Sequence, residues 1–244
     1  MDVTGWTHLC IYVGTFASSY YYSLMTESLM SALCLGWSIY GLTTIGHDLL
    51  HKPTTMNRCV AFVCMDMIIL DSDSWIQQHN KDHHGDLKGD KDFMHIKGST
   101  IFEEWYNLLD ICKTSSPKCH MLRAPFYLLL LQLRWYQIIM TYITIFFCLA
   151  YFTYITHSDS ITSKYIRGCI LYNLDNTWDI FPESRFITLL FGALNAHATH
   201  HCYPTCGRSE LAEKSRYLAK TYPEHYRSIT TCKELYHLYS NRFA

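Results

Sequence analysis

The chain has 244 residues, a length that suits one domain or one small polytopic membrane unit and gives no reason to expect a modular enzyme. Hydrophobic residues make up 49% of the chain and charged residues only 17%, a balance that favours a membrane protein over an ordinary soluble domain. The formal net charge of −1 provides no bulk field that would attract nucleic acid, so we expect no nucleic-acid partner.

The N-terminal part of the chain predicts a helical hairpin. Residues 7–46 contain no Lys, Arg or Asp and a single Glu, Glu27, and they are numerous enough for two closely spaced membrane spans. We place these spans at 7–25 and 28–46. A second apolar stretch, residues 121–155, predicts either one long span or a second hairpin.

The segments between and after the hairpins are polar and predict a soluble cap. Lys and Arg concentrate in 47–118 and in 203–244, whereas the connector near Glu27 has none, so the positive-inside rule puts the loop, the tail and both termini in the cytosol. The apolar run 58–70 is too short to cross a bilayer and is interpreted as an interfacial or buried helix. We therefore predict an all-α polytopic membrane protein, a single domain over 1–244 with a cytosolic histidine-rich helical cap formed by 47–118 and 157–244.

The eleven cysteines do not indicate a disulfide scaffold or a zinc ribbon. None of them forms a CxxC pair and several lie in apolar stretches, so we interpret them as reduced. Cys202 and Cys206 lie four residues apart beside a histidine cluster, and we interpret them as packing or incidental thiols.

Histidine is the informative residue type. Eight of the 14 histidines fall in the windows 47–51, 79–84 and 197–201, where random placement would put about one. Each window contains an i,i+4 pair, which on an α-helix presents two imidazoles on one face. The predicted metal ligands are His47, His51, His79, His83, His84, His197, His200 and His201.

Eight clustered imidazoles predict two metal ions rather than one. A single zinc ion takes three or four protein ligands, whereas two ions that keep positions open for oxygen would use all eight, and iron is the expected metal. We interpret the isolated histidines as interfacial or hydrogen-bonded residues without metal: His8, His95, His120, His157, His225 and His237.

The three windows resemble the histidine boxes of the membrane fatty acid desaturase family, and the resemblance covers about residues 30–226. Gly46-His-Asp-Leu-Leu-His51 resembles the first box, and Trp75-Ile-Gln-Gln-His79-Asn-Lys-Asp-His83-His84 with the acidic Asp90-Lys-Asp92 after it resembles the second. Asn195-Ala-His197-Ala-Thr-His200-His201-Cys-Tyr-Pro204 is similar to the third.

The resemblance implies a fold, a reaction and a set of partners. It implies four transmembrane helices under a cytosolic cap that holds two non-haem irons, so the second apolar stretch is expected to be a hairpin with spans at 119–136 and 138–156 and a turn near Arg134–Gln137. It also implies an O2-dependent desaturase that introduces a double bond into a long-chain acyl lipid or acyl-CoA. No fused cytochrome b5 signature is present, so a separate electron donor such as cytochrome b5 or ferredoxin is implied. The expected location is an integral, multi-pass one, in the endoplasmic reticulum membrane if the source is eukaryotic.

Two features depart from the family pattern. The family often supplies a further metal-shell side chain before the third box, but no His occurs between His157 and His197. Asn173 is the nearest polar substitute, with a surface or capping role as the alternative. The third box begins with His197, where front-end desaturases often carry Gln. Carboxylates beside the boxes are further candidates for fixing a ligand ring, with solvated loop charges as the alternative: Asp48, Asp82 and Asp92.

Two other functions remain open from the sequence. A hydroxylase or ketolase of the same superfamily would carry the same boxes, because the boxes indicate iron and oxygen rather than the product. A non-catalytic membrane protein that stores or senses metal through these histidines is the alternative from a different class.

Overall fold

A computed structural model describes residues 1–68, 71–85, 87, 117–156 and 170–242 of the chain. These residues are mostly helical, which confirms the predicted all-α class, with one two-stranded parallel pairing. The elements are α1 (Val3–Thr26), α2 (Leu29–Leu50), α3 (Thr55–Ala61), η1 (Phe62–Asp66), α4 (Ser72–Trp75), η2 (Ile76–His83), α6 (Pro117–Leu130), α7 (Trp135–Thr156), α8 (Ile170–Asn176), β1 (Asp179–Ile180), α9 (Arg185–Leu190), α10 (His197–Cys202), α11 (Leu211–Thr221), β2 (Ser228–Ile229) and α12 (Cys232–Arg242).

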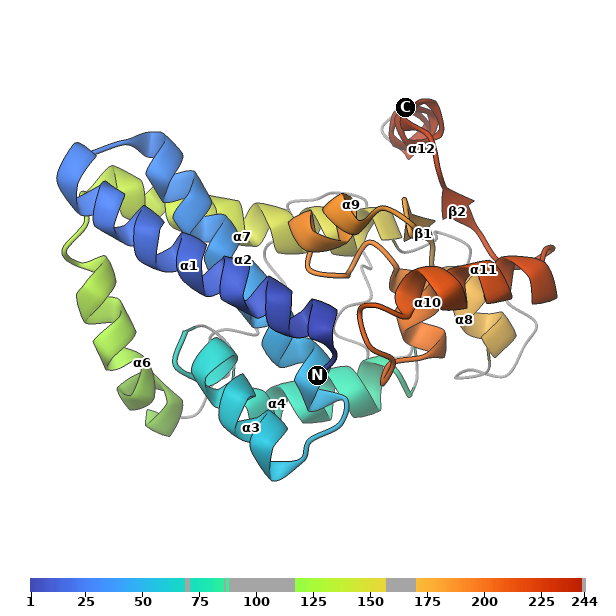
Figure 1. Ribbon diagram of the computed structural model, residues 1–244, viewed down its shortest axis with the longest axis horizontal. Coiled ribbons are helices and arrows are strands. Elements are labelled where there is room, and N and C mark those ends of the chain that lie inside the picture. Colours follow the sequence, from blue (N-terminus) through green and yellow to red (C-terminus); the bar gives the residue numbers. More distant parts are fainter. Residues whose placement is uncertain (69–70, 86, 88–116, 157–169, 243–244) are drawn as a thin grey trace.

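A helical hairpin forms the N-terminal part of the fold. Helix α1 begins at the N-cap Asp2, whose carboxylate accepts the N–H of Gly5 at 2.7 Å, and it ends at Glu27, whose φ of 52° is left-handed. Helix α2 returns beside α1 and also packs against α7, so it is the central and most buried of the three (Figure 1). Both helices lie where the sequence predicts spans, although α2 extends to Leu50 and so carries His47.

The second pair of apolar helices is less regular. Helices α6 and α7 are separated at residues 131–134, so the predicted break lies at Arg134, but they point away from it in different directions (Figure 1). With 14 residues, α6 is about 21 Å long, whereas a hydrocarbon core is about 30 Å thick. Within the described residues, α2 is the one helix long and apolar enough to cross a membrane. The four-span topology therefore stays a prediction.

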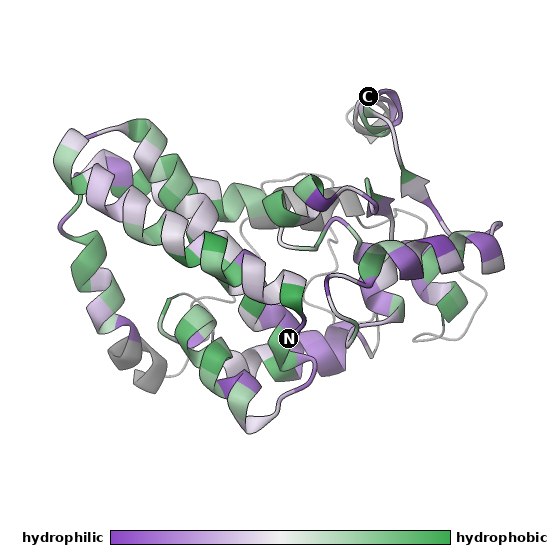
Figure 2. Ribbon diagram, in the orientation of Figure 1, coloured by the Kyte–Doolittle hydropathy of each residue, from purple (hydrophilic) through white to green (hydrophobic). Residues whose placement is uncertain are grey.

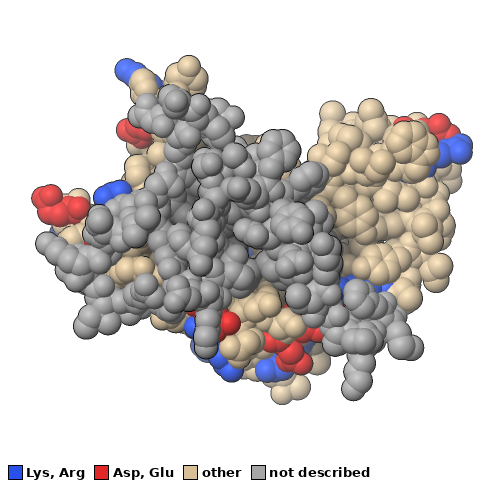
Figure 3. All heavy atoms as spheres, turned by 180° about the vertical axis from the view of Figure 1, so that it is seen from behind, with Lys and Arg blue, Asp and Glu red and all other residues tan. Residues whose placement is uncertain are grey.

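Hydrophobic residues are spread along α1, α2, α6 and α7, whereas hydrophilic residues are concentrated in η2 and α11 (Figure 2). Large apolar side chains are exposed along the outer helices, among them Val13, Met25, Leu128, Ile139 and Phe147. On the face drawn in Figure 3, the lobe formed by these helices is almost free of charge except at its far end. An exposed apolar belt of this kind fits a helical bundle that is covered by lipid.

The remaining helices form the cap at the other end of the bundle. Elements α3 to η2 follow the end of α2 directly, and α10 packs against α8 and α11, whereas α12 lies apart from α3 to η2 (Figure 1). Strand β1 pairs in parallel with β2, and Asp179 in β1 also forms an antiparallel bridge with Ala196, the residue before α10. This small pairing places the third histidine window against the C-terminal tail.

Candidate metal centre

Three separate elements bring the histidine windows to one place. The last turn of α2 carries His47 and leads to His51, η2 carries the second window, and α10 carries the third. All eight histidines are buried or partly buried. The sequence predicts their convergence only through the family resemblance, because the windows are up to about 150 residues apart along the chain.

The second window adopts a π-helix rather than the expected α-helix. The N–H of His84 donates to the carbonyl of His79 at 2.9 Å, an i,i+5 bond that widens the turn. As a result His79 aligns with His84, and their Nε2 atoms lie 3.1 Å apart, whereas His83 turns toward the third window. The expectation that His79 and His83 act as one i,i+4 pair is therefore wrong: they belong to different groups.

The first group contains four imidazoles from all three windows. The Nε2 atom of His47 lies 2.8 Å from Nε2 of His79 and 3.4 Å from Nε2 of His51. The ring of His200 lies beside these three imidazoles, with its centroid 4.8 Å from that of His47. The ligand atoms of His47, His51, His79 and His200 all lie within 4.8 Å of one another.

The second group contains three imidazoles. The Nε2 atom of His201 lies 3.1 Å from that of His83 and 3.0 Å from that of His197. His84 lies between the groups, because its Nε2 approaches His79 while its ring stacks on that of His201 at 4.4 Å. The third window thus divides between the groups: His200 joins the first, and His197 and His201 join the second.

The distances within each group are compatible with imidazoles that share a metal ion. Two nitrogens that share one ion at about 2.1 Å are roughly 3.0 to 3.4 Å apart when the angle between them is octahedral or tetrahedral. Three of the four Nε2 separations lie between 3.0 and 3.4 Å and so within that range, and the separation between His47 and His79, 2.8 Å, is slightly shorter. Nε2 of His200 is buried without a hydrogen-bond partner among the described residues, which is costly unless a cation takes its lone pair.

Burial also keeps the clustered imidazoles in the neutral form that binds metal. Loss of hydration, followed by repulsion from neighbouring histidines, lowers the pKa of His51 from 6.5 to about 3. The same two causes hold the pKa values of His79, His84, His200 and His201 well below the usual range. Neutral rings with free lone pairs are what metal coordination requires.

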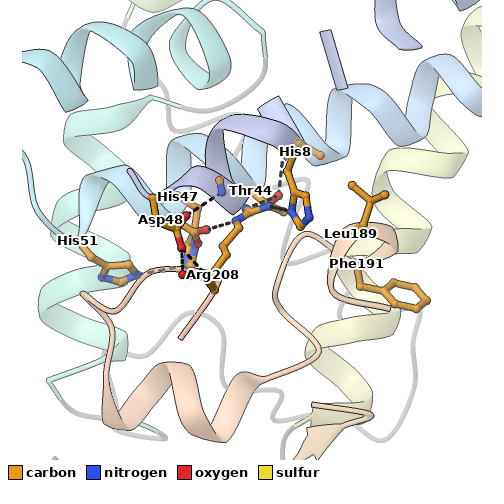
Figure 4. Close-up of polar contacts among 12 residues, drawn as sticks. His8, Thr44, His47, Asp48, His51, Leu189, Phe191 and Arg208 are labelled. Carbon is orange, nitrogen blue, oxygen red and sulfur yellow. Dashed lines mark hydrogen bonds and ion pairs between the residues drawn. The ribbon is translucent and has the colours of Figure 1, made fainter. Parts of the chain in front are cut away.

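Of the predicted supporting carboxylates, Asp48 contacts a candidate ligand. Nδ1 of His47 donates to Asp48 Oδ1 at 2.8 Å, so the lone pair of this ring is on Nε2, which faces the group (Figure 4). The hydrogen bond that the structure gives Asp82 is with exposed Gln77, at 3.4 Å. Asp92 lies outside the described residues. The supporting roles of Asp82 and Asp92 stay predictions.

Asn173 lies behind the third window rather than in a loop. It is buried in α8, and its Nδ2 donates to the backbone carbonyl of His201 at 3.2 Å. Its Oδ1 is buried and has no hydrogen-bond partner among the described residues. An unpaired acceptor beside a candidate ligand is consistent with the predicted role of Asn173 near the metal, which stays a prediction.

A buried carboxylate that sequence reasoning missed holds α10 in place. Asp179 accepts the N–H of Thr199 at 3.1 Å and the hydroxyls of Thr199, Ser215 and Tyr226 at 2.5, 3.1 and 2.8 Å. Since the N-cap residue Ala196 has no side-chain acceptor, Asp179 caps α10 from β1. The sequence signal is a lone acid in the apolar run Trp178-Asp179-Ile180-Phe181.

Sequence reasoning also missed two side chains beside the histidine groups. Trp75 stacks on the ring of His79, with centroids 4.6 Å apart and planes at 17°. Arg208 pairs with Asp48. His225, one of the isolated histidines that we interpreted as interfacial or hydrogen-bonded, is partly buried, and its Nδ1 lies 2.9 Å from Asp175 Oδ1. Neither Cys202 nor Cys206 forms a disulfide with another described residue.

The fatty acid desaturase family model matches residues 119–233, which contain the third histidine window, Asn173 and Asp179. The predicted family resemblance is confirmed. The first two windows precede the matched desaturase region, and the fold brings them against its third window. No curated protein matches the chain. This match suggests an oxidoreductase that acts on a fatty acyl group with oxygen.

Proposed function

We propose that this chain is a membrane-embedded, di-iron, O2-dependent desaturase that introduces a double bond into a long-chain acyl group. The observation that carries the proposal is the pair of imidazole groups, four and three ligands, with His84 between them. Four or three imidazoles would leave positions open on a six-coordinate iron, as oxygen activation requires, whereas four ligands would complete a structural zinc site.

Two irons bound to neutral imidazoles would supply the power to activate oxygen and to remove hydrogen from an unactivated methylene, which no side chain can do. The chain supplies the geometry. Asp48 fixes the ring of His47, Trp75 restricts the ring of His79, and Asp179 fixes the helix that carries the third window. Ligand side chains oriented in this way would hold the metal ions in place.

The proposed reaction needs an external electron donor. Reduction of one O2 to two waters takes four electrons, and removal of two hydrogen atoms from the acyl chain provides two of them. The other two, with two protons, must come from a carrier, for which cytochrome b5 or ferredoxin is the proposed class. The substrate is an acyl lipid or an acyl-CoA whose chain enters from the bilayer.

Membrane embedding, with four spans and both termini cytosolic, is part of the proposal. Asp2 beside the N-terminus accepts the N–H of Ser209 at 2.7 Å, so the start of α1 lies with the cap. The exposed apolar belt on the outer helices and the apolar α2 support insertion in a bilayer.

Expression in a yeast strain that lacks its own desaturase tests the proposal. We expect new unsaturated fatty acids in the mass-spectrometric profile, and close to two irons with little zinc in gently purified protein. Hydroxylated or oxidised acyl chains would assign the chain to the hydroxylase or ketolase alternative instead. Tightly bound zinc with no oxygen consumption would contradict the proposal and favour a metal-storing protein.

A further inference from the structure

Arg208 occupies a buried position between α1, α2 and the segment after the third window. Its side chain is only 4% exposed, and its Nε donates to Asp48 Oδ2 at 2.7 Å. Nη1 donates to Nδ1 of His8 at 3.2 Å, and Nη2 donates to the hydroxyl of Thr44 at 3.2 Å (Figure 4). Every nitrogen of the guanidinium group therefore has a partner, which fixes the plane of the group.

The contact with Asp48 leads directly to the candidate metal centre. Asp48 uses its other oxygen, Oδ1, to accept Nδ1–H of His47. Both oxygens of this carboxylate are thus engaged, one by the arginine and one by the imidazole. This arrangement holds His47 in the tautomer whose Nε2 lone pair faces Nε2 of His79, 2.8 Å away.

The backbone that carries Arg208 is itself clamped. Asp2 Oδ2 accepts both the N–H and the hydroxyl of Ser209, at 2.7 and 2.6 Å, while Asp2 Oδ1 caps α1 through Gly5. A Cβ on Gly207 would lie 2.6 Å from Asp2 Oδ2, so the carboxylate fits against this glycine. The start of the chain therefore presents Arg208 to Asp48 from a rigid segment.

We infer that Arg208 is a positioning residue for the His47 metal ligand and acts through Asp48. The inference rests on the proposed metal-binding function and adds to it a residue that lies after the third window. The competing explanation is that Arg208 only fastens α1 and α2 to the cap through His8 and Thr44. The two explanations differ in whether the effect of Arg208 passes through Asp48.

The test measures how fast the purified full-length protein in detergent, loaded anaerobically with Fe2+, releases iron to a chelator. Loss of a partner that orients a metal ligand typically costs about 10- to 100-fold in affinity, so we expect Arg208→Met and Asp48→Asn each to accelerate release by about that factor. Arg208→Lys keeps one charged donor and should fall between wild type and Arg208→Met. The double variant should release iron no faster than Asp48→Asn alone.

Arg216→Met is the matched control. Arg216 lines the same 600 Å³ cavity as Arg208, but its partner is Glu183 at 3.1 Å and both side chains are more than half exposed. We expect its iron release to equal that of wild type. Unchanged release in Arg208→Met would overturn the inference. So would a double variant whose acceleration is the product of the two single effects, because that result describes an independent fastening role.

Failure of the proposed function would be visible separately, as wild-type protein that retains no iron. The inference is then tested on metal-free protein by nitrogen-15 NMR of the His47 ring, assigned by comparison with His47→Gln. We expect the Nδ1–H tautomer to dominate in wild type and in Arg216→Met, and to lose its dominance in Arg208→Met. The same tautomer population in all three proteins would overturn the inference.

Discussion

Arg134 Nε donates to Glu27 Oε1 at 2.9 Å, and these two are the only charged residues in the apolar segments 3–46 and 124–156. Glu27 ends the first hairpin's outgoing helix and Arg134 ends the break between α6 and α7, so both turns lie at the same end of the bundle. Gln137 strengthens this junction by donating to the carbonyl of Ser23 at 3.0 Å. Both histidine groups lie beyond the other end of α2, away from this junction.

This pairing gives a prediction of topology. If the bundle spans a bilayer, an inserted loop with a glycosylation acceptor between Glu27 and Ser28 should be modified in the lumen, and the same loop after Glu224 in the tail should not. Mass shifts after treatment with a glycosidase measure both. Glycosylation of the tail insertion but not of the turn insertion would show the opposite orientation. Glycosylation of both insertions would refute a cytosolic cap over two hairpins.

Packing between α2 and α7 predicts a specific requirement for glycine. A Cβ on Gly36 would lie 2.6 Å from the backbone carbonyl oxygen of Thr141, which cannot move without shifting α7, whereas a Cβ on Gly14 would meet nothing within 4 Å. Both glycines are helical, so replacement by Ala gives each a similar gain of about 1 kcal/mol in helix propensity. We expect Gly36→Ala to lower the melting temperature and Gly14→Ala to leave it unchanged or raise it. Equal melting curves would contradict the close contact.

The depressed pKa values predict that metal-free protein loses stability in acid. His51 has a folded pKa of about 3 against an ordinary 6.5, and four neighbouring ligands are shifted in the same direction. Between those two values the unfolded chain binds protons that the folded chain excludes, so stability is complete above about pH 6.5 and falls as the pH is lowered toward 3. Circular dichroism melts between pH 5 and pH 8 check this. A melting temperature that rises on acidification would contradict the buried, neutral cluster.

Local patterns were enough to predict the helices and the candidate ligands. Long apolar runs locate α1, α2 and α7, and the histidine spacing picks out the eight residues that the fold brings together. The sequence could not predict the π-helix at 76–83, because the same residue pattern suits an α-helix and a π-helix and tertiary contacts decide between them. That choice moves His83 from one group to the other.

Residues that act across long separations were also beyond sequence reasoning. Arg208 meets Asp48 from 160 positions away, and Asp179 caps a helix that begins 18 residues later. A charged residue near a motif is usually solvated, so nothing local distinguishes Arg208 from Arg216. Only the folded contacts show that one is buried against the centre and the other is exposed.

The division of the third window predicts an asymmetric effect for His200. His200→Ala leaves His47, His51 and His79 in the first group and does not touch the second. We expect product formation to be abolished and the iron content to fall from about two toward one per chain, while the protein still inserts in the membrane. His237→Ala, at an exposed site on α12, is the control and should match wild type. Full activity in His200→Ala, or equal loss in both variants, would mean that the ligand assignment is wrong.

The network around Asp179 predicts that α10 depends on a residue outside the histidine windows. Asp179→Ala removes the acceptor of one backbone N–H and three hydroxyls in a fully buried place, and a buried donor without a partner costs about 1–3 kcal/mol. We expect a loss of at least about 3 kcal/mol, which for a chain of this length lowers the melting temperature by about 6–12 °C. Tyr226→Phe removes one of the four donors and keeps the carboxylate paired, so it should cost only about 1 kcal/mol. Because α10 carries three candidate ligands, Asp179→Ala should also lower the iron content, whereas Tyr226→Phe should not. Differential scanning fluorimetry and elemental analysis of the same detergent-purified samples measure both effects. An Asp179→Ala protein that melts and binds iron as wild type does would show that α10 is held by other contacts.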